Sequence, residues 1–181
     1  MVNRSTKVVI TGACSNVGKL LISRLSKNSH LEISGLCSPR TNLTERSKLS
    51  QVNWFRHDLV EPVTGEIANT LHNADYVIHL AWARGRNIEA SVNINRRIII
   101  NLSSSFKNPS QFIFFSSVAA SPTALSTYGI AKYTVMTEVE SRGGIVLVCG
   151  LVTSSPPFGP YKLLSELVSR CPLQLRLLGG G

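Results

Sequence analysis

Short apolar runs alternate with amphipathic segments along the whole chain. Six runs are rich in β-branched and aromatic residues and continuously apolar in the middle, as is typical of strands covered on both faces. They are residues 7–11, 32–37, 52–56, 76–80, 111–116 and 145–149. The segments between them have helical character, at residues 17–27, 66–73, 89–107, 126–142 and 161–170. This alternation predicts an α/β fold, a doubly wound Rossmann-type parallel sheet with helices on both faces.

The stretch VVITGACSNVG, residues 8–18, joins the first predicted strand to the first predicted helix. Gly18, Leu21, Ile22 and Leu25 recur at helical spacing, which predicts that this face packs on the sheet. Gly18 would let the start of the helix lie close to the first strand. Backbone N–H groups of the turn would face outward at a helix N-terminus, which favours a pyrophosphate. An ordinary strand–turn–helix junction is the alternative.

Composition describes one globular domain over residues 1–181, with 43% hydrophobic and 16% charged residues. No apolar run approaches the roughly 20 residues that cross a bilayer, and no signal-peptide core follows the first residues, so we expect a cytoplasmic protein without membrane contact. The cysteines lack metal-ligand spacing, and we expect them to be reduced, buried thiols. They are Cys14, Cys37, Cys149 and Cys171.

The net charge of +9 favours anionic partners such as nucleotide phosphates or nucleic acid. The basic residues are scattered, and the densest groups are pairs such as Arg84 with Arg86. We therefore interpret them as a solvated surface in preference to a nucleic-acid groove.

Tyr128 and Lys132 are four positions apart on a predicted helix, so both side chains project from one face. A tyrosine with its usual pKa of about 10 is a poor base at neutral pH. A neighbouring ammonium stabilises the phenolate and lowers that pKa, which suits the pair to proton transfer.

Several motifs together resemble the extended short-chain dehydrogenase/reductases, the family of nucleotide-sugar epimerases and dehydratases. TGACSNVG is similar to that family's TGxxGxxG loop, with Ser15 in place of the central glycine. FRHDL, VIHLAW, VNIN, FIFFSSVAA and YGIAK follow in the family's order, and the set spans essentially the whole chain.

The resemblance implies a catalytic set of Ser117, Tyr128 and Lys132. Tyr128 would move a proton to or from a substrate hydroxyl during hydride transfer, and Ser117 would position the reacting group. Ser116 is the competing candidate for the serine. Asn93 or Asn101 could anchor a water relay, or could simply be a helix cap.

The resemblance also implies an NAD(P) site. Its expected members are Gly12, Cys14, Ser15, Asn16, Val17, Gly18, Ser38, Arg40, Asp58, Leu59, Leu80, Ala81, Trp82 and Lys132. Cys37 stands where NAD-binding proteins carry an acidic residue for the ribose 2′-OH, and Ser38 and Arg40 follow it. An arginine without a carboxylate suits a 2′-phosphate, so we expect NADP in preference to NAD. His79 has an expected structural role beside the cofactor, and Trp82 could narrow the cleft or pack in the core.

Family members generally continue for about a hundred residues beyond this chain, so the resemblance implies a truncated member with residues 151–181 as a remnant of the substrate region. The expected function is an NAD(P)-dependent oxidoreductase, epimerase or dehydratase acting on a nucleotide sugar or a similar substrate. A catalytically inert nucleotide-binding sensor is the alternative. The family also implies a homodimer through the predicted helices 89–107 and 126–142.

Overall fold

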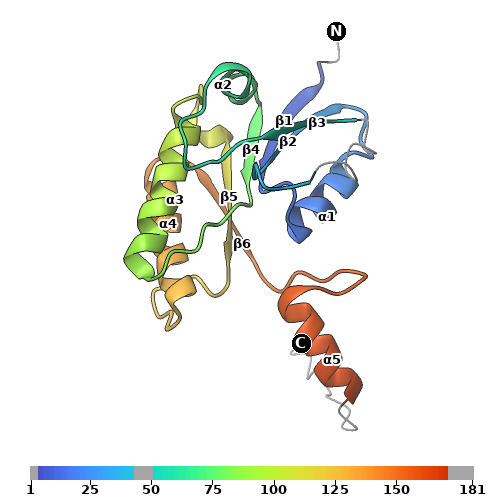
Figure 1. Ribbon diagram of the computed structural model, residues 1–181, viewed down its shortest axis with the longest axis vertical. Helices are drawn as coiled ribbons and strands as arrows, with labels where there is room; N and C mark the ends of the chain where they lie inside the picture. The colour runs from blue at the N-terminus through green and yellow to red at the C-terminus, as the bar shows by residue number, and fades with distance from the viewer. Residues whose placement is uncertain (1–3, 43–50, 171–181) are drawn as a thin grey trace, which may run out of the picture. The chain divides into compact units, whose positions relative to one another are not determined.

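The computed structural model describes residues 4–42 and 51–170 (Figure 1). The chain forms two compact units, residues 1–149 and 150–181. The first unit contains a sheet of six parallel strands in the order β3-β2-β1-β4-β5-β6. This order confirms the predicted doubly wound Rossmann-type fold.

The strand predictions hold to within one residue at each end. The strands are β1 (Thr6–Thr11), β2 (Leu31–Cys37), β3 (Val52–Arg56), β4 (Tyr76–His79), β5 (Phe112–Ser117) and β6 (Ile145–Cys149). Four of the helices lie in the first unit: α1 (Asn16–Leu25), α2 (Gly65–His72), α3 (Ile88–Ser103) and α4 (Thr127–Ser141). The expected helix over 89–107 ends four residues earlier, because Ser104 caps it and its N–H returns to the Ile100 and Leu102 carbonyls.

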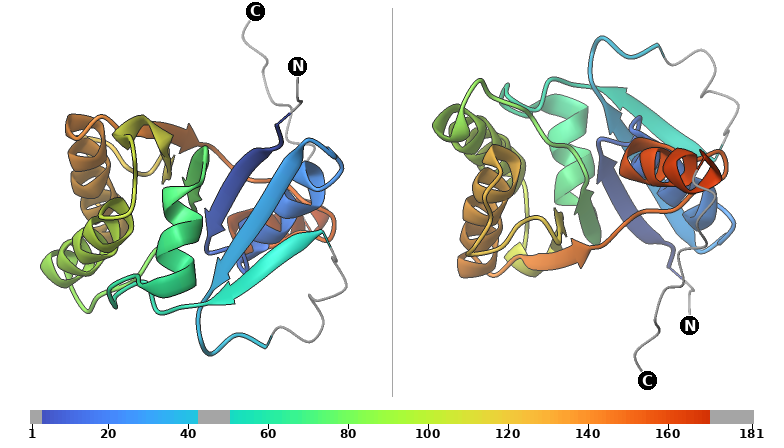
Figure 2. Two further views of the ribbon diagram at one scale, coloured as in Figure 1. Left: turned by 90° about the horizontal axis from the view of Figure 1, so that it is seen from above. Right: turned by 90° about the horizontal axis from the view of Figure 1, so that it is seen from below.

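Two apolar clusters cover the two faces of the sheet. Ile22 of α1 packs with Val8, Ile10 and Ile33 on one face. The helices α2, α3 and α4 supply the second cluster, in which Phe114 of β5 is fully buried. Figures 1 and 2 accordingly show α1 on one side of the sheet and α3 beside α4 on the other. Burial on both faces explains why the central strands are continuously apolar.

The second unit contains the helix α5 (Gly159–Arg170). A Lys162–Glu166 ion pair links successive turns of this helix. Its exposed apolar residues are Leu163, Leu164, Leu167 and Val168. No helix in the described part of the chain combines the length and apolar character needed to cross a membrane.

Candidate active site

The site lies at the edge where all six parallel strands end. The strand order reverses there between β1 and β4, which is the position where open α/β sheets bind ligands. Thr11 ends β1 and His79 ends β4, and their Oγ1 and Nδ1 atoms are hydrogen-bonded at 2.6 Å. The segments that follow these two strands, the glycine loop and residues 80–82, carry most of the predicted cofactor residues.

Two glycines of the loop are required by close backbone contacts. Gly12 has a φ of 66°, and a Cβ there would lie 2.7 Å from the Ala81 nitrogen. A Cβ on Gly18 would lie 2.5 Å from the Gly12 carbonyl oxygen. The close approach predicted for Gly18 is therefore confirmed, and the loop packs directly against the segment after β4.

Ser15, which replaces the central glycine of the motif, is the N-cap of α1. Its φ of −70° needs no glycine, and its Oγ accepts a hydrogen bond from the Gly18 N–H at 3.0 Å. One N–H at this helix start is thereby already satisfied by the chain itself. The N–H groups of Asn16 and Val17 belong to the same first turn, where no helical carbonyl lies behind them.

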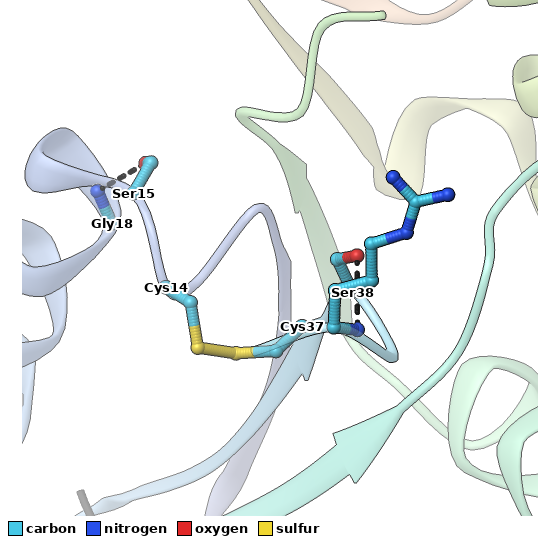
Figure 3. The surroundings of a disulfide bond; sticks show 6 residues. Cys14, Ser15, Gly18, Cys37 and Ser38 are labelled. Carbon is cyan, nitrogen blue, oxygen red and sulfur yellow. Dashed lines mark hydrogen bonds between the residues drawn. A yellow bond between two sulfur atoms is a disulfide. The ribbon is translucent and has the colours of Figure 1, made fainter. Parts of the chain in front are cut away.

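A disulfide joins Cys14 in the loop to Cys37 at the end of β2 (Figure 3). The expectation of reduced thiols is therefore wrong for this pair. Because β1 and β2 are paired in parallel, with Thr11 opposite Leu36, the residues just beyond these positions come side by side. Cys149 is a free thiol, as expected, but it is only partly buried, and Cys171 lies outside the described residues.

Ser38 and Arg40 are exposed in the turn that follows Cys37, at the same edge as the loop. The Arg40 backbone N–H donates to the Ser38 Oγ at 3.4 Å. The His57 N–H donates to the Cys37 carbonyl at 2.9 Å, which brings the end of β3 to the same place. The expected ribose-side residues thus lie next to the disulfide.

Asp58 and Leu59 lie in the turn after β3. The exposed Asp58 carboxylate accepts a hydrogen bond from the Val60 N–H at 3.1 Å, so it stabilises its own turn. Asn101 of α3 donates to the carbonyls of Leu59 and Val60 at 3.1 and 2.8 Å. Asn101 therefore braces this turn, and the other candidate for a relay, Asn93, is exposed.

Ser117, Tyr128 and Lys132 come together where β5 ends and α4 begins. The Ser126 Oγ caps α4 by accepting from the Gly129 N–H, which fixes the first turn that carries Tyr128. Burial raises the pKa of Tyr128, and the neighbouring Ser117 hydroxyl and the Arg84 charge act in the opposite direction. The sequence predicts a lowered pKa for this tyrosine, but in this structure the Lys132 Nζ lies 5.7 Å from the centre of the Tyr128 ring and desolvation dominates.

The Lys132 ammonium is buried among aromatic rings, and the side chain is only 4% exposed. Its Nζ lies 4.5 Å from the centre of the Trp82 ring and 4.8 Å from that of Phe114. Burial lowers the pKa of Lys132 to about 8. Burial, and then the charge of Lys132, lowers the pKa of His79 to about 3, so this histidine is neutral.

Further polar groups at this side of the site are buried without a partner. The Ser116 Oγ and the His79 Nε2 form no hydrogen bond in the described structure. Ser116 alternates with Ser117 along β5, and only Ser117 influences Tyr128, which favours Ser117 of the two candidates. Cys149, opposite Ser117 in the β5–β6 pairing, faces Lys132, and burial raises its pKa.

Sequence reasoning missed Asn95 of α3. This fully buried amide accepts from the Ala83 N–H at 3.1 Å and donates to the Ala83 and Ser91 carbonyls at 2.8 and 2.7 Å. It therefore holds the segment immediately after Trp82. The VNIN motif contains Asn95, but its spacing alone does not distinguish it from Asn93.

Two further observations concern metal binding and the cavities of the first unit. Among the described residues, no cluster of three or more His, Cys, Asp or Glu side chains could hold a metal ion. A hollow of about 560 Å³ lies between β1, β2, β3 and α2, and none of the predicted site residues lines it.

No protein-family model and no curated protein matches the chain. Solved structures do share its fold. UDP-glucuronic acid 4-epimerase from Bacillus cereus, in complex with NAD, is 20% identical with a TM-score of 0.66, and the match covers 93% of this chain and 64% of that one. WbmH from Bordetella bronchiseptica, in complex with NAD⁺, is 15% identical with a TM-score of 0.63, at 92% and 63% coverage.

The terminal R domain from the myxalamid PKS-NRPS biosynthetic pathway is similar as well, at 17% identity and a TM-score of 0.64, covering 85% of this chain and 51% of that one. The chain thus spans about half to two thirds of the length of these structures. At these identities the likeness shows the fold, and the fold is the one that the motifs predict.

Proposed function

We propose that this protein binds NAD(P) at the carboxyl edge of its sheet and transfers hydride and a proton at a hydroxyl or carbonyl carbon of its substrate. The observation that carries the proposal is the meeting of Ser117, Tyr128 and Lys132 on the edge that also carries the glycine loop. A nucleotide sugar is the proposed substrate class, because one of the similar folds is an epimerase of UDP-glucuronic acid.

The residues present fit a dinucleotide. The Asn16 and Val17 N–H groups at the start of α1 are suited to a pyrophosphate, and Gly12 and Gly18 leave the loop free of bulky side chains. The buried Lys132 ammonium forms no ion pair in the described structure, so hydroxyl oxygens of a ribose would satisfy it. The nicotinamide would supply or accept the hydride.

Tyr128 would act as the proton donor or acceptor for the substrate oxygen. Its raised pKa keeps the phenol protonated at neutral pH, so in the state described here it is an acid. Ser117 would hold the reacting oxygen beside that phenol. The ammonium of Lys132, once hydrated or bound to hydroxyls, would favour the phenolate and allow the reverse step.

We also propose a preference for NADP. No carboxylate stands at the end of β2, where the Cys37 sulfur is bonded to Cys14, and Ser38 and Arg40 are exposed in the next turn. The arginine would bind a ribose 2′-phosphate, whereas a 2′-OH would find no acceptor carboxylate among residues 37–42.

A nucleotide-binding protein without turnover is the second candidate. Two departures from the motif favour it: the Ser15 hydroxyl occupies the Gly18 N–H, and the Trp82 indole covers Lys132. Both features would weaken cofactor engagement without changing the fold.

A homodimer through α3 and α4 is a further part of the proposal. Ile100 on α3 is 51% exposed, while Arg96 of α3 and Glu138 of α4 form a bidentate ion pair that holds the two helices together. An Ile100→Asp variant should shift the protein from dimer to monomer in size-exclusion chromatography with light scattering. A wild-type protein that is monomeric at all concentrations would contradict the dimer.

Titration with NADPH and NADH, followed by nicotinamide fluorescence, tests the cofactor. Saturable binding with NADPH tighter than NADH is expected, and Arg40→Ala should weaken NADPH about tenfold or more while leaving NADH unchanged. Arg24→Ala, which removes an exposed charge from the last turn of α1, is the matched control. Binding of neither nucleotide would overturn the proposal.

The Tyr128→Phe variant distinguishes the two candidate functions, an enzyme and a nucleotide-binding protein without turnover. It should retain NADPH binding and abolish turnover in a screen of nucleotide sugars, because only the hydroxyl is lost. If wild-type protein binds NADPH tightly but converts no nucleotide sugar or simple carbonyl compound, the second candidate is the correct one.

A further inference from the structure

Trp82 lies directly over the Tyr128–Lys132 pair. Its ring centre is 4.5 Å from the Lys132 Nζ, and its ring meets that of Tyr128 nearly at a right angle, at 81° and 5.9 Å between centroids. A similar edge contact joins it to Phe114 at 6.5 Å. The indole therefore touches both members of the pair from one side.

Among the residues that the structure describes, no acidic side chain balances the charge of Lys132. The titratable groups around it are His79 from β4, Cys149 from β6 and Tyr128 from its own helix, and Arg84 adds a positive charge near Tyr128. Within the described structure, the ammonium is stabilised by the faces of aromatic rings and by no ion pair. A buried cation in this state needs a polar partner from outside the chain.

The segment that carries Trp82 is anchored on both sides. Asn95 binds the N–H and the carbonyl of Ala83, the next residue. On the other side, the backbone of Ala81 is in close contact with Gly12. The backbone on each side of Trp82 is thus anchored, and a movement of the indole would be a rotation of its side chain.

We propose that Trp82 is a positioning residue, an aromatic roof that limits the access of water to Lys132 and that shifts when a ligand presents oxygen atoms to the lysine. The inference rests on the proposed function in one respect, that the ligand is the dinucleotide. The roof itself is independent of which ligand binds. With the indole in its present position, Lys132 is 4% exposed, whereas Tyr128 is 38% exposed and open to solvent.

Competitive acylation of lysines with acetic anhydride, read by peptide mass spectrometry from pH 6 to 11, tests the roof without any ligand. In the wild type the Lys132 midpoint should lie near pH 8, with slow labelling even above it. Trp82→Ala should raise the midpoint toward the usual value of about 10.4 and speed labelling at pH 11 several-fold, because water and reagent reach the amine. Trp82→Phe should also label faster at pH 11, by a smaller factor.

Trp54→Phe is the matched control, since it changes the other tryptophan of the chain and should leave Lys132 labelling unchanged. An unchanged midpoint and rate in Trp82→Ala, with native circular dichroism, would overturn the roof. If Trp82→Ala does not fold, Trp82→Phe decides by its rate at pH 11.

A separate experiment tests whether the Trp82 indole shifts when a ligand binds. Trp54→Phe keeps Trp82 as its one tryptophan, so its emission should change in position or lifetime as NADPH saturates, and Lys132 should become protected from acylation. NADPH binding without either change would overturn the shift while leaving the proposed function intact. Faster labelling in Trp82→Ala without any NADPH binding would leave the roof intact and overturn the proposed function.

Discussion

The two halves of the candidate site are built in opposite ways. On the β1–β2 side, the loop is held by a covalent bond between Cys14 and Cys37, and the Ser15 hydroxyl satisfies the Gly18 N–H. On the β4–β5 side, the Ser116 Oγ and the His79 Nε2 are buried without hydrogen-bonding partners, and the buried Lys132 forms no ion pair in the described structure. The first half is cross-linked and capped by its own side chains, whereas the second contains buried side-chain atoms without partners.

The first half is therefore suited to a fixed loop geometry, and the second to binding or reacting with a ligand. Satisfied groups and a cross-link favour one loop geometry, as a site for a fixed phosphate requires. Buried polar groups without partners cost stability, and proteins retain such groups mainly where a ligand or a reaction uses them. On the β4–β5 side we therefore expect substitutions of the buried polar groups to increase stability and to reduce function.

Removing the disulfide should have the largest effect on stability. The bond closes a loop between residues 23 positions apart, and Cys14→Ser with Cys37→Ser should lower the free energy of unfolding by about 3 kcal/mol. Urea denaturation of the oxidised protein and the variant measures the difference.

Dithiothreitol should lower the free energy of unfolding of the wild type to that of the double-serine variant, and should not change that of the variant. Cys149→Ser is the control, because this thiol is free and the substitution should change stability little. Peptide mapping without reduction should recover residues 14 and 37 in one cross-linked product. Two separately alkylated thiols in freshly purified protein would contradict the covalent half of the comparison.

Replacing Lys132 by methionine should act in the opposite direction and stabilise the fold by about 2 kcal/mol at pH 7, because it removes a buried cation and keeps the apolar stem. Burial lowers the pKa of Lys132 to about 8, below the value of about 10.4 in an unfolded chain. Between these two pH values the unfolded chain binds a proton that the folded protein has released. The wild type therefore gains stability as the pH rises through this window, and its deficit relative to the variant closes near pH 10.5.

Thermal unfolding of both proteins at pH 7 and pH 10.5 measures that gap. Lys19→Met on α1 is the control at an exposed position, and its stability should equal that of the wild type at both pH values. A Lys132→Met variant that is less stable than the wild type at pH 7 would mean that the lysine is paired, and the contrast between the two halves would fail.

The fold could be predicted from the sequence because strand-and-helix alternation is a local pattern, and the parallel order follows from it. Tyr128 and Lys132 could be predicted as neighbours because four positions span one helical turn. Three features could not: the Cys14–Cys37 bond, the Asn95 anchor and the position of Trp82 over Lys132. Each depends on contacts between segments far apart in the chain, and the hydrophobic pattern carries no information about side-chain direction at strand ends.

The smallest expected effect concerns Ser15. Its hydroxyl occupies the Gly18 N–H, and the test is whether this hydrogen bond weakens the binding of a phosphate at the loop. Ser15→Ala should cost about 1 kcal/mol of stability, since the N-cap of α1 is lost, and Ser15→Gly only a few tenths. Both free the Gly18 N–H, and Ser15→Gly also restores the motif's glycine. NADPH should then bind Ser15→Gly several-fold more tightly than the wild type.

Asn87→Ala is the control, because it removes a matching N-cap from α3. The Asn87 side chain accepts from the Ala90 N–H at 2.8 Å, and its loss should lower stability without changing nucleotide affinity. If Ser15→Gly binds NADPH more weakly than the wild type, the hydroxyl itself contacts the phosphate, and Ser15 belongs to the binding site as a ligand-contacting residue instead of competing with it.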